Sequence, residues 1–155
     1  MNYGRVVLAG LAGAVAYFVC GGVISGQLIA KEYKPYEGVY RSREAIMSYF
    51  PMGIAATVIA IIILAAIYAK GYEGGSGALE GLRFGALVGI FIVFAVVADE
   101  YVTLNIGARL AAFMALGRFI GWLATGLVIG LVYKPAAPKT AWSSHFPTLL
   151  PLAAA

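Results

Sequence analysis

The chain has 155 residues, of which 62% are hydrophobic and 12% are charged, and its net charge is +4. A soluble domain carries roughly a quarter charged residues, so this composition excludes a protein whose whole surface faces water. The eleven Lys and Arg residues are scattered along the chain and form no basic stripe, which argues against nucleic acid as a partner and fits contact with membrane lipids.

Two apolar runs in the first half of the chain predict membrane-spanning helices. Residues 6–30 and residues 50–69 contain no charged side chain, and a helix of about 20 such residues crosses the hydrocarbon core. The first run is longer than the roughly 7–15 apolar residues of a signal peptide, so we expect it to be retained as the first span. Pro51 is expected in the first turn of the second helix, where its missing N–H is tolerated.

Two further spans are predicted over residues 80–102 and residues 110–133. Arg83 lies near the start of the third span, where its long side chain can reach the head groups, and Arg118 interrupts the fourth. The sequence therefore predicts an all-α fold, a transmembrane bundle of four helices.

The segments outside these spans differ in character. Residues 31–49 form a polar, tyrosine-rich loop, which suits the head-group zone of a membrane, and residues 41–49 are compatible with a short surface helix. Residues 135–155 are broken by prolines and are unsuited to a fifth span. We expect a transmembrane domain over residues 1–134 and an extended C-terminal tail over residues 135–155.

Four spans place both ends of the transmembrane domain on one side of the membrane. Five Lys and Arg residues flank the spans on each side, so the positive-inside rule gives no preference. We expect a multi-pass protein of the bacterial inner membrane, with cytoplasmic termini because no export signal precedes Arg5.

Glycines recur at helical spacing into the third span and along the fourth, and Gly22 and Gly26 repeat the spacing in the first. The glycines concerned are Gly77, Gly81, Gly85, Gly89, Gly117, Gly121, Gly126 and Gly130. Residues four apart share a helix face, and small residues there let two backbones approach closely in lipid. The stripes therefore predict helix packing, either within the chain or against another subunit.

Charged residues lie around the turn that joins the third and fourth spans. Asp99 and Glu100 end the third span, while Arg109 and Arg118 flank and enter the fourth. An unpaired charge inside a membrane costs several kcal/mol, so we expect Asp99 or Glu100 to pair with Arg118 and Arg109 to reach the interface. The pairing is either a structural clamp, a proton- or ion-coupling pair, or a contact with lipid or a partner.

The sequence offers little chemistry for catalysis or cofactor binding. His145 is the sole histidine and lies in the tail, so no histidine inside a span can hold haem or chlorophyll. Ser143, Ser144 and His145 are consecutive, whereas a serine nucleophile needs a base and an orienting group brought in by the fold. We therefore expect no enzyme activity, no cofactor and no metal.

Two short motifs lead into the third span: KGYEG at residues 70–74 precedes it, and EGLRFG at residues 80–85 begins it. Together with four apolar spans, they resemble a family of small four-helix bacterial membrane proteins of unknown function. The resemblance covers residues 1–134 and implies the four-helix fold without implying catalytic residues. Residues 135–155 depart from it, because family members usually end soon after the fourth helix.

Three functions are compatible with these features. The first is an accessory or structural subunit of a larger membrane complex, such as a respiratory or photosynthetic assembly, which docks through the glycine faces and through Trp142, His145 and Phe146 of the tail. The alternative is a small oligomeric transporter or channel that uses Asp99, Glu100 and Arg118. A lipid-modifying enzyme is the third, for which the tyrosine-rich loop supplies few candidates.

Overall fold

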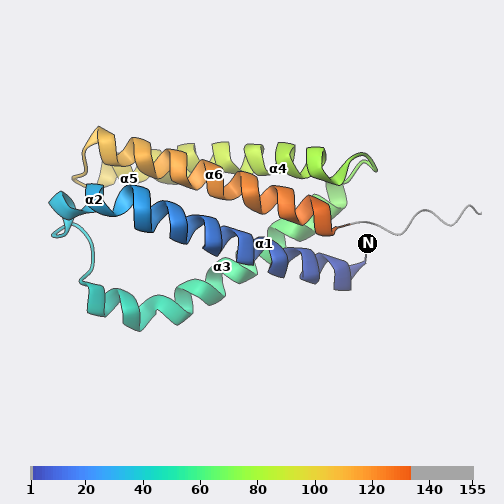
Figure 1. Cartoon of the computed structure of the whole chain (residues 1–155), viewed down its shortest axis with the longest axis horizontal. Helices are drawn as coiled ribbons and strands as arrows, with labels where there is room; N and C mark the ends of the chain where they lie inside the picture. The colour runs from blue at the N-terminus through green and yellow to red at the C-terminus, as the bar shows by residue number, and fades with distance from the viewer. Residues whose placement is uncertain (1, 134–155) are drawn as a thin grey trace, which may run out of the picture.

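The computed structural model describes residues 2–133, which are helical apart from short connections (Figure 1). In chain order the helices are α1 (Tyr3–Val23), α2 (Ala30–Tyr33), α3 (Arg43–Gly71), α4 (Gly77–Ile92), α5 (Ala98–Thr103) and α6 (Ala108–Val132). Two π-helical segments, Ile24–Ile29 and Val93–Val97, join α1 to α2 and α4 to α5.

Four helical stretches within residues 2–133 are long and apolar enough to cross a membrane. They are Tyr3–Val23, Arg43–Gly71, Gly77–Thr103 and Ala108–Val132. The expected all-α bundle of four spans is therefore confirmed, and the chain is a multi-pass membrane protein. The predicted tail over residues 135–155 and its boundary with the transmembrane domain lie outside the described residues.

The second span begins earlier than the sequence predicted. It starts at Arg43, so the surface helix expected over residues 41–49 is instead the first part of α3. The side chain of Ser42 caps this helix by accepting a hydrogen bond from the backbone N–H of Ala45 at 3.3 Å. Pro51 therefore lies inside the helix, beyond its first turn, and the predicted first-turn position was wrong.

The helices of the bundle pack around two separate cores. Helices α4 and α6 run side by side along their lengths, and α1 packs against α6 and against the second half of α3 (Figure 1). The main core lies where these helices meet and is centred on Ile61, Ala65, Trp122 and Ile129. A second, smaller core at the other end of the bundle joins the loop after α1 to the α5–α6 turn through Ile29, Val97 and Leu110.

The first half of α3 departs from the bundle. Figure 1 shows α3 diverging from α1 toward its own N-terminal end. Every residue from position 46 to position 56 is exposed, on all sides of the helix, whereas Ile61, Ala65 and Tyr68 in the second half are buried. One membrane-spanning helix is thus packed at one end and unpacked at the other.

Candidate functional site

The glycines of α4 lie against the backbone of α6 at van der Waals contact. A Cβ atom at Gly85 would lie 2.6 Å from the carbonyl oxygen of Trp122, and Cβ atoms at Gly77 and Gly81 would collide with the carbonyl oxygens of Gly130 and Gly126. We call this contact the glycine seam; its members are Gly77, Gly81, Gly85, Gly126 and Gly130. The seam is a contact within the chain, which leaves these stripes no free face for another subunit.

The remaining predicted glycines lie elsewhere. Gly89 faces the Phe119 ring, and Gly117 faces Ile24 and Ile29. Gly121 lies beside Tyr17, whose Cε2 would be 4.0 Å from an added Cβ. The first helix packs through Gly10 and Gly13, and among the described residues nothing lies within 4 Å of a Cβ built at Gly22 or Gly26, so the spacing of those two glycines did not predict packing.

Arg118 pairs with Glu100 across the turn between α5 and α6. Its Nη2 atom lies 2.8 Å from both Oε1 and Oε2 of Glu100. Each side chain is 28% exposed, so the ion pair is partly buried. Because an isolated charge is costly at membrane depth, the pairing explains how α6 tolerates an arginine eleven residues into a membrane-spanning helix.

The other two predicted charges do not join this pair. Asp99 is exposed, and its backbone carbonyl, not its carboxylate, accepts a hydrogen bond from the Thr103 hydroxyl at 2.8 Å. Arg109 forms its own ion pair with Glu32 at 2.9 Å, although its side chain remains 76% exposed. Sequence reasoning missed Glu32, because it lies 77 residues from Arg109 in the short helix α2, whose position the sequence did not predict.

A partly open hollow of about 710 Å³ lies beside Arg118, between α1, α6 and the diverging part of α3. We call it the inner hollow. Its wall contains four glycines, namely Gly21, Gly22, Gly117 and Gly121, and four aromatic side chains, namely Tyr17, Phe18, Tyr33 and Phe50. Arg118 and the Tyr33 hydroxyl give this otherwise largely apolar space one polar region.

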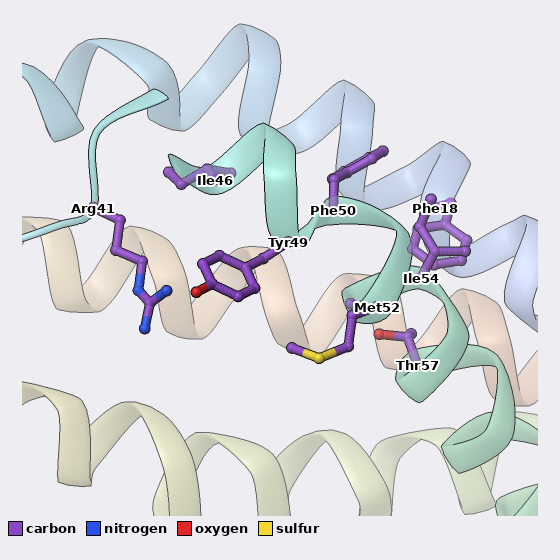
Figure 2. A pocket seen from close by; sticks show the side chains of 9 residues that line it. Phe18, Arg41, Ile46, Tyr49, Phe50, Met52, Ile54 and Thr57 are labelled. Carbon is purple, nitrogen blue, oxygen red and sulfur yellow. The ribbon is translucent and has the colours of Figure 1, made fainter. Parts of the chain in front are cut away.

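A second hollow of about 420 Å³ adjoins the first on the side of α3, and we call it the outer hollow. Figure 2 shows Phe18 of α1 beside Phe50 and Ile54 of α3, the three side chains that line both hollows. Toward the start of α3, the Arg41 guanidinium lies over the Tyr49 ring, 4.6 Å from its centroid. The two hollows together form a lateral opening between α1 and α3.

Tyr33, from the tyrosine-rich loop, lines the inner hollow together with Arg118. The rings of Tyr33 and Tyr40 meet edge to face with their centroids 5.3 Å apart, and the Tyr40 hydroxyl donates to Met114 Sδ at 4.0 Å. Burial raises the pKa of Tyr33 above its ordinary value, and neighbouring Tyr40 raises it further while Arg118 opposes the rise. Burial, together with the Glu100 carboxylate, also raises the pKa of Tyr40. Both hydroxyls therefore stay protonated, and Tyr33 keeps a donor beside Arg118.

The motifs at residues 70–74 and 80–85 form a structured turn. The Glu80 carboxylate accepts hydrogen bonds from the backbone N–H groups of Gly75 at 2.6 Å and Glu73 at 3.3 Å. Gly74 adopts φ +91°, a left-handed conformation that favours glycine. Phe84 packs edge to face on Tyr68, with ring centroids 5.4 Å apart. The motif residues thus close the α3–α4 turn and begin the glycine seam.

Some of the predicted features lie outside the residues that the structure describes. Trp142, His145 and Phe146 lie outside residues 2–133. Within the described residues, no three His, Cys, Asp or Glu side chains gather closely enough to hold a metal ion. No family model, no curated protein and no solved structure matches the chain.

Proposed function

We propose that this protein is a non-catalytic accessory subunit of a larger membrane complex, and that it docks through the first half of α3. The observation that carries the proposal is the continuous exposure of residues 46–56 on all sides of a helix whose second half is packed. The partner that fits this surface is an apolar transmembrane helix, because the exposed side chains include Ile46, Met47, Phe50 and Met52. Membrane lipids would cover the remaining apolar faces.

Pro51 adds a second reason for a partner at this place. It lacks a backbone N–H, so the carbonyl of Met47, four residues earlier, loses its helical hydrogen-bond donor. A backbone carbonyl without a donor is unfavourable inside the hydrocarbon region. A partner side chain that donates a hydrogen bond there would remove this cost, which lipid tails cannot do.

The proposed docking surface differs from the one that the glycine spacing suggested. The glycine faces of α4 and α6 already pack against each other in the glycine seam. Association through α3 needs no rearrangement of that seam. The tail residues Trp142, His145 and Phe146 remain a second proposed contact with the partner.

The test compares two tryptophan substitutions on opposite halves of α3. Met52 is 66% exposed in the proposed docking half, and Ile63 is 55% exposed in the packed half, so Ile63→Trp is the matched control. Tagged chains are extracted from native membranes in mild detergent and sized. We expect wild type and Ile63→Trp in one large assembly and Met52→Trp as a smaller species. If wild type elutes as an isolated chain, or if Met52→Trp remains fully assembled, the proposal is wrong.

The transporter alternative is supported by fewer charged residues than the sequence suggested. It would depend on Glu100 and Arg118 without Asp99, which is exposed away from their ion pair. A flux that is lost in Glu100→Gln but kept in Asp99→Asn would favour the transporter.

A further inference from the structure

We propose that the inner hollow binds an isoprenoid quinone or a close chemical equivalent: an uncharged, planar ring that carries carbonyl oxygens, attached to a long apolar chain. The ring would lie beside Arg118 and Tyr33, and the chain would leave through the lateral opening between α1 and α3. The inner hollow adjoins the proposed docking surface, since Phe50 and Ile54 belong to both, but its argument does not need a partner there.

The size and shape of the hollow suit such a ring. Its volume of about 710 Å³ falls within the roughly 300–1,000 Å³ of small-molecule sites. Gly21 and Gly22 leave the α1 side of the hollow without side chains, because no described atom lies within 4 Å of a Cβ at either position. Gly117 and Gly121 form part of the α6 side. Aromatic walls favour offset or edge-on packing with a planar ring.

The charges favour a neutral head group that accepts hydrogen bonds. Arg118 and Glu100 neutralise each other, and the carboxylate would repel a phosphate that approached the guanidinium. Glu100 contacts only the Nη2 nitrogen, and among the side chains that the structure describes none hydrogen-bonds the other two guanidinium nitrogens. An arginine has five N–H donors and no acceptor, so the unused donors select an oxygen such as a carbonyl.

The position of the hollow in the membrane agrees with this choice. The Cα of Arg118 is ten residues beyond the start of α6 at Ala108, which is about 15 Å along the helix axis. Gly121 extends the hollow further in the same direction. A charged head group is costly at such a depth, whereas an uncharged ring dissolves in the hydrocarbon. The outer hollow, which shares Phe18, Phe50 and Ile54 with the inner one, gives the apolar chain its way out to the lipid.

Trp122 provides a direct readout of binding. It lies on α6 next to Gly121, and its ring centroid is 5.1 Å from that of Tyr17, which lines the hollow. The sequence contains two tryptophans, so Trp142→Phe leaves Trp122 as the single reporter. Titration of the purified full chain with a decyl-substituted benzoquinone should quench this fluorescence in a saturable way.

The decisive variant fills the hollow without disturbing the helices. A Cβ at Gly21 meets nothing within 4 Å, so Gly21→Leu should fold and place its side chain in the hollow. Gly26 is equally open but does not line the hollow, which makes Gly26→Leu the matched control. We expect Gly21→Leu to weaken binding at least about tenfold and Gly26→Leu to leave it unchanged. Quenching that never saturates, or that is equal in both variants, overturns the proposal.

Two further measurements test the chemistry of recognition. Tyr33→Phe removes one neutral donor and should weaken quinone binding about fivefold, as expected for one hydrogen bond. Decylbenzene has the same chain without carbonyl oxygens and should compete poorly. If an equal concentration of decylbenzene restores Trp122 fluorescence in the presence of the quinone, the hollow is a non-selective apolar cavity and the quinone assignment is wrong. If phosphatidylglycerol displaces it instead, the occupant is an anionic lipid, and the quinone assignment is wrong.

Discussion

The Nη2 atom of Arg118 lies 2.8 Å from each carboxylate oxygen of Glu100, although the two residues are 18 positions apart and belong to different helices. This contact closes the α5–α6 turn from the inside of the bundle. It also keeps a guanidinium beside the inner hollow with its charge balanced. Removing either partner leaves a single charge within a membrane-spanning segment, which makes the pair a sensitive point of the fold.

Glu100→Gln is expected to destabilise the folded protein by about 2 kcal/mol, below the range for fully buried pairs because both side chains are 28% exposed. Thermal unfolding in detergent measures this loss. Adding Arg118→Gln to Glu100→Gln should restore part of the stability, since the unpaired charge disappears. Asp99→Asn is the matched control and should change stability by no more than about 0.5 kcal/mol. Equal losses in Glu100→Gln and Asp99→Asn would contradict the pairing.

Gly81→Ala is expected to destabilise the protein by about 1–3 kcal/mol, because its new methyl group would collide with the Gly126 carbonyl in the glycine seam. Gly53→Ala supplies a control of opposite sign. No described atom lies within 4 Å of a Cβ at Gly53, which is inside α3, so this change should stabilise the helix by about 0.5–1 kcal/mol. Melting temperatures that move in the same direction for both variants would count against a tight seam.

Gly74→Ala should cost about 1–2 kcal/mol, because Gly74 has φ +91° and an alanine there adopts a left-handed conformation. Gly38→Ala, in another loop, makes the same change at a position with an ordinary backbone and open space. The free energy of unfolding of the two variants can be compared in one detergent. Tolerance of alanine at residue 74 would show that the turn is not held in the observed conformation.

Alkaline pH is expected to loosen the tyrosine-rich loop. The pKa values of Tyr33 and Tyr40 are raised above 10.0 in the folded protein, so between that value and their folded pKa the folded state binds more protons than the unfolded state. Stability contributed by these groups is therefore complete below pH 10 and declines as the pH rises further. The double variant Tyr33→Phe, Tyr40→Phe should lose less stability than wild type over this interval, and tyrosinate absorbance should show fewer late-titrating groups.

The sequence predicted the number and type of the spans because hydropathy alone decides whether a segment can cross a membrane. It placed the start of the second span too late, since residues 43–49 are mixed in polarity and Pro51 resembles a first-turn proline. The useful signal was Ser42, a helix-capping residue followed two positions later by Glu44 in the first turn. Capping geometry, in this case, was a better guide than apolar content.

The candidate site was predictable only in part. Glu100 and Arg118 could be paired from the sequence because a short turn joins their helices. The pairing of Arg109 with Glu32 depends on how the loop after α1 folds back, and the hollows depend on the angle between α1 and α3. Tertiary arrangement decides both, and no local pattern of residues carries that information.

The π-helical segment Val93–Val97 sets the direction in which Glu100 points. A π turn holds one residue more than the α-helical turn it replaces. If the same residues were wound as a regular α-helix, everything beyond them would turn by about 100° around the axis relative to α4. Glu100 would then face away from Arg118 while the glycine seam stayed in place. The rotational phase of this one helix therefore decides whether the membrane interior contains a neutral pair or a lone cation.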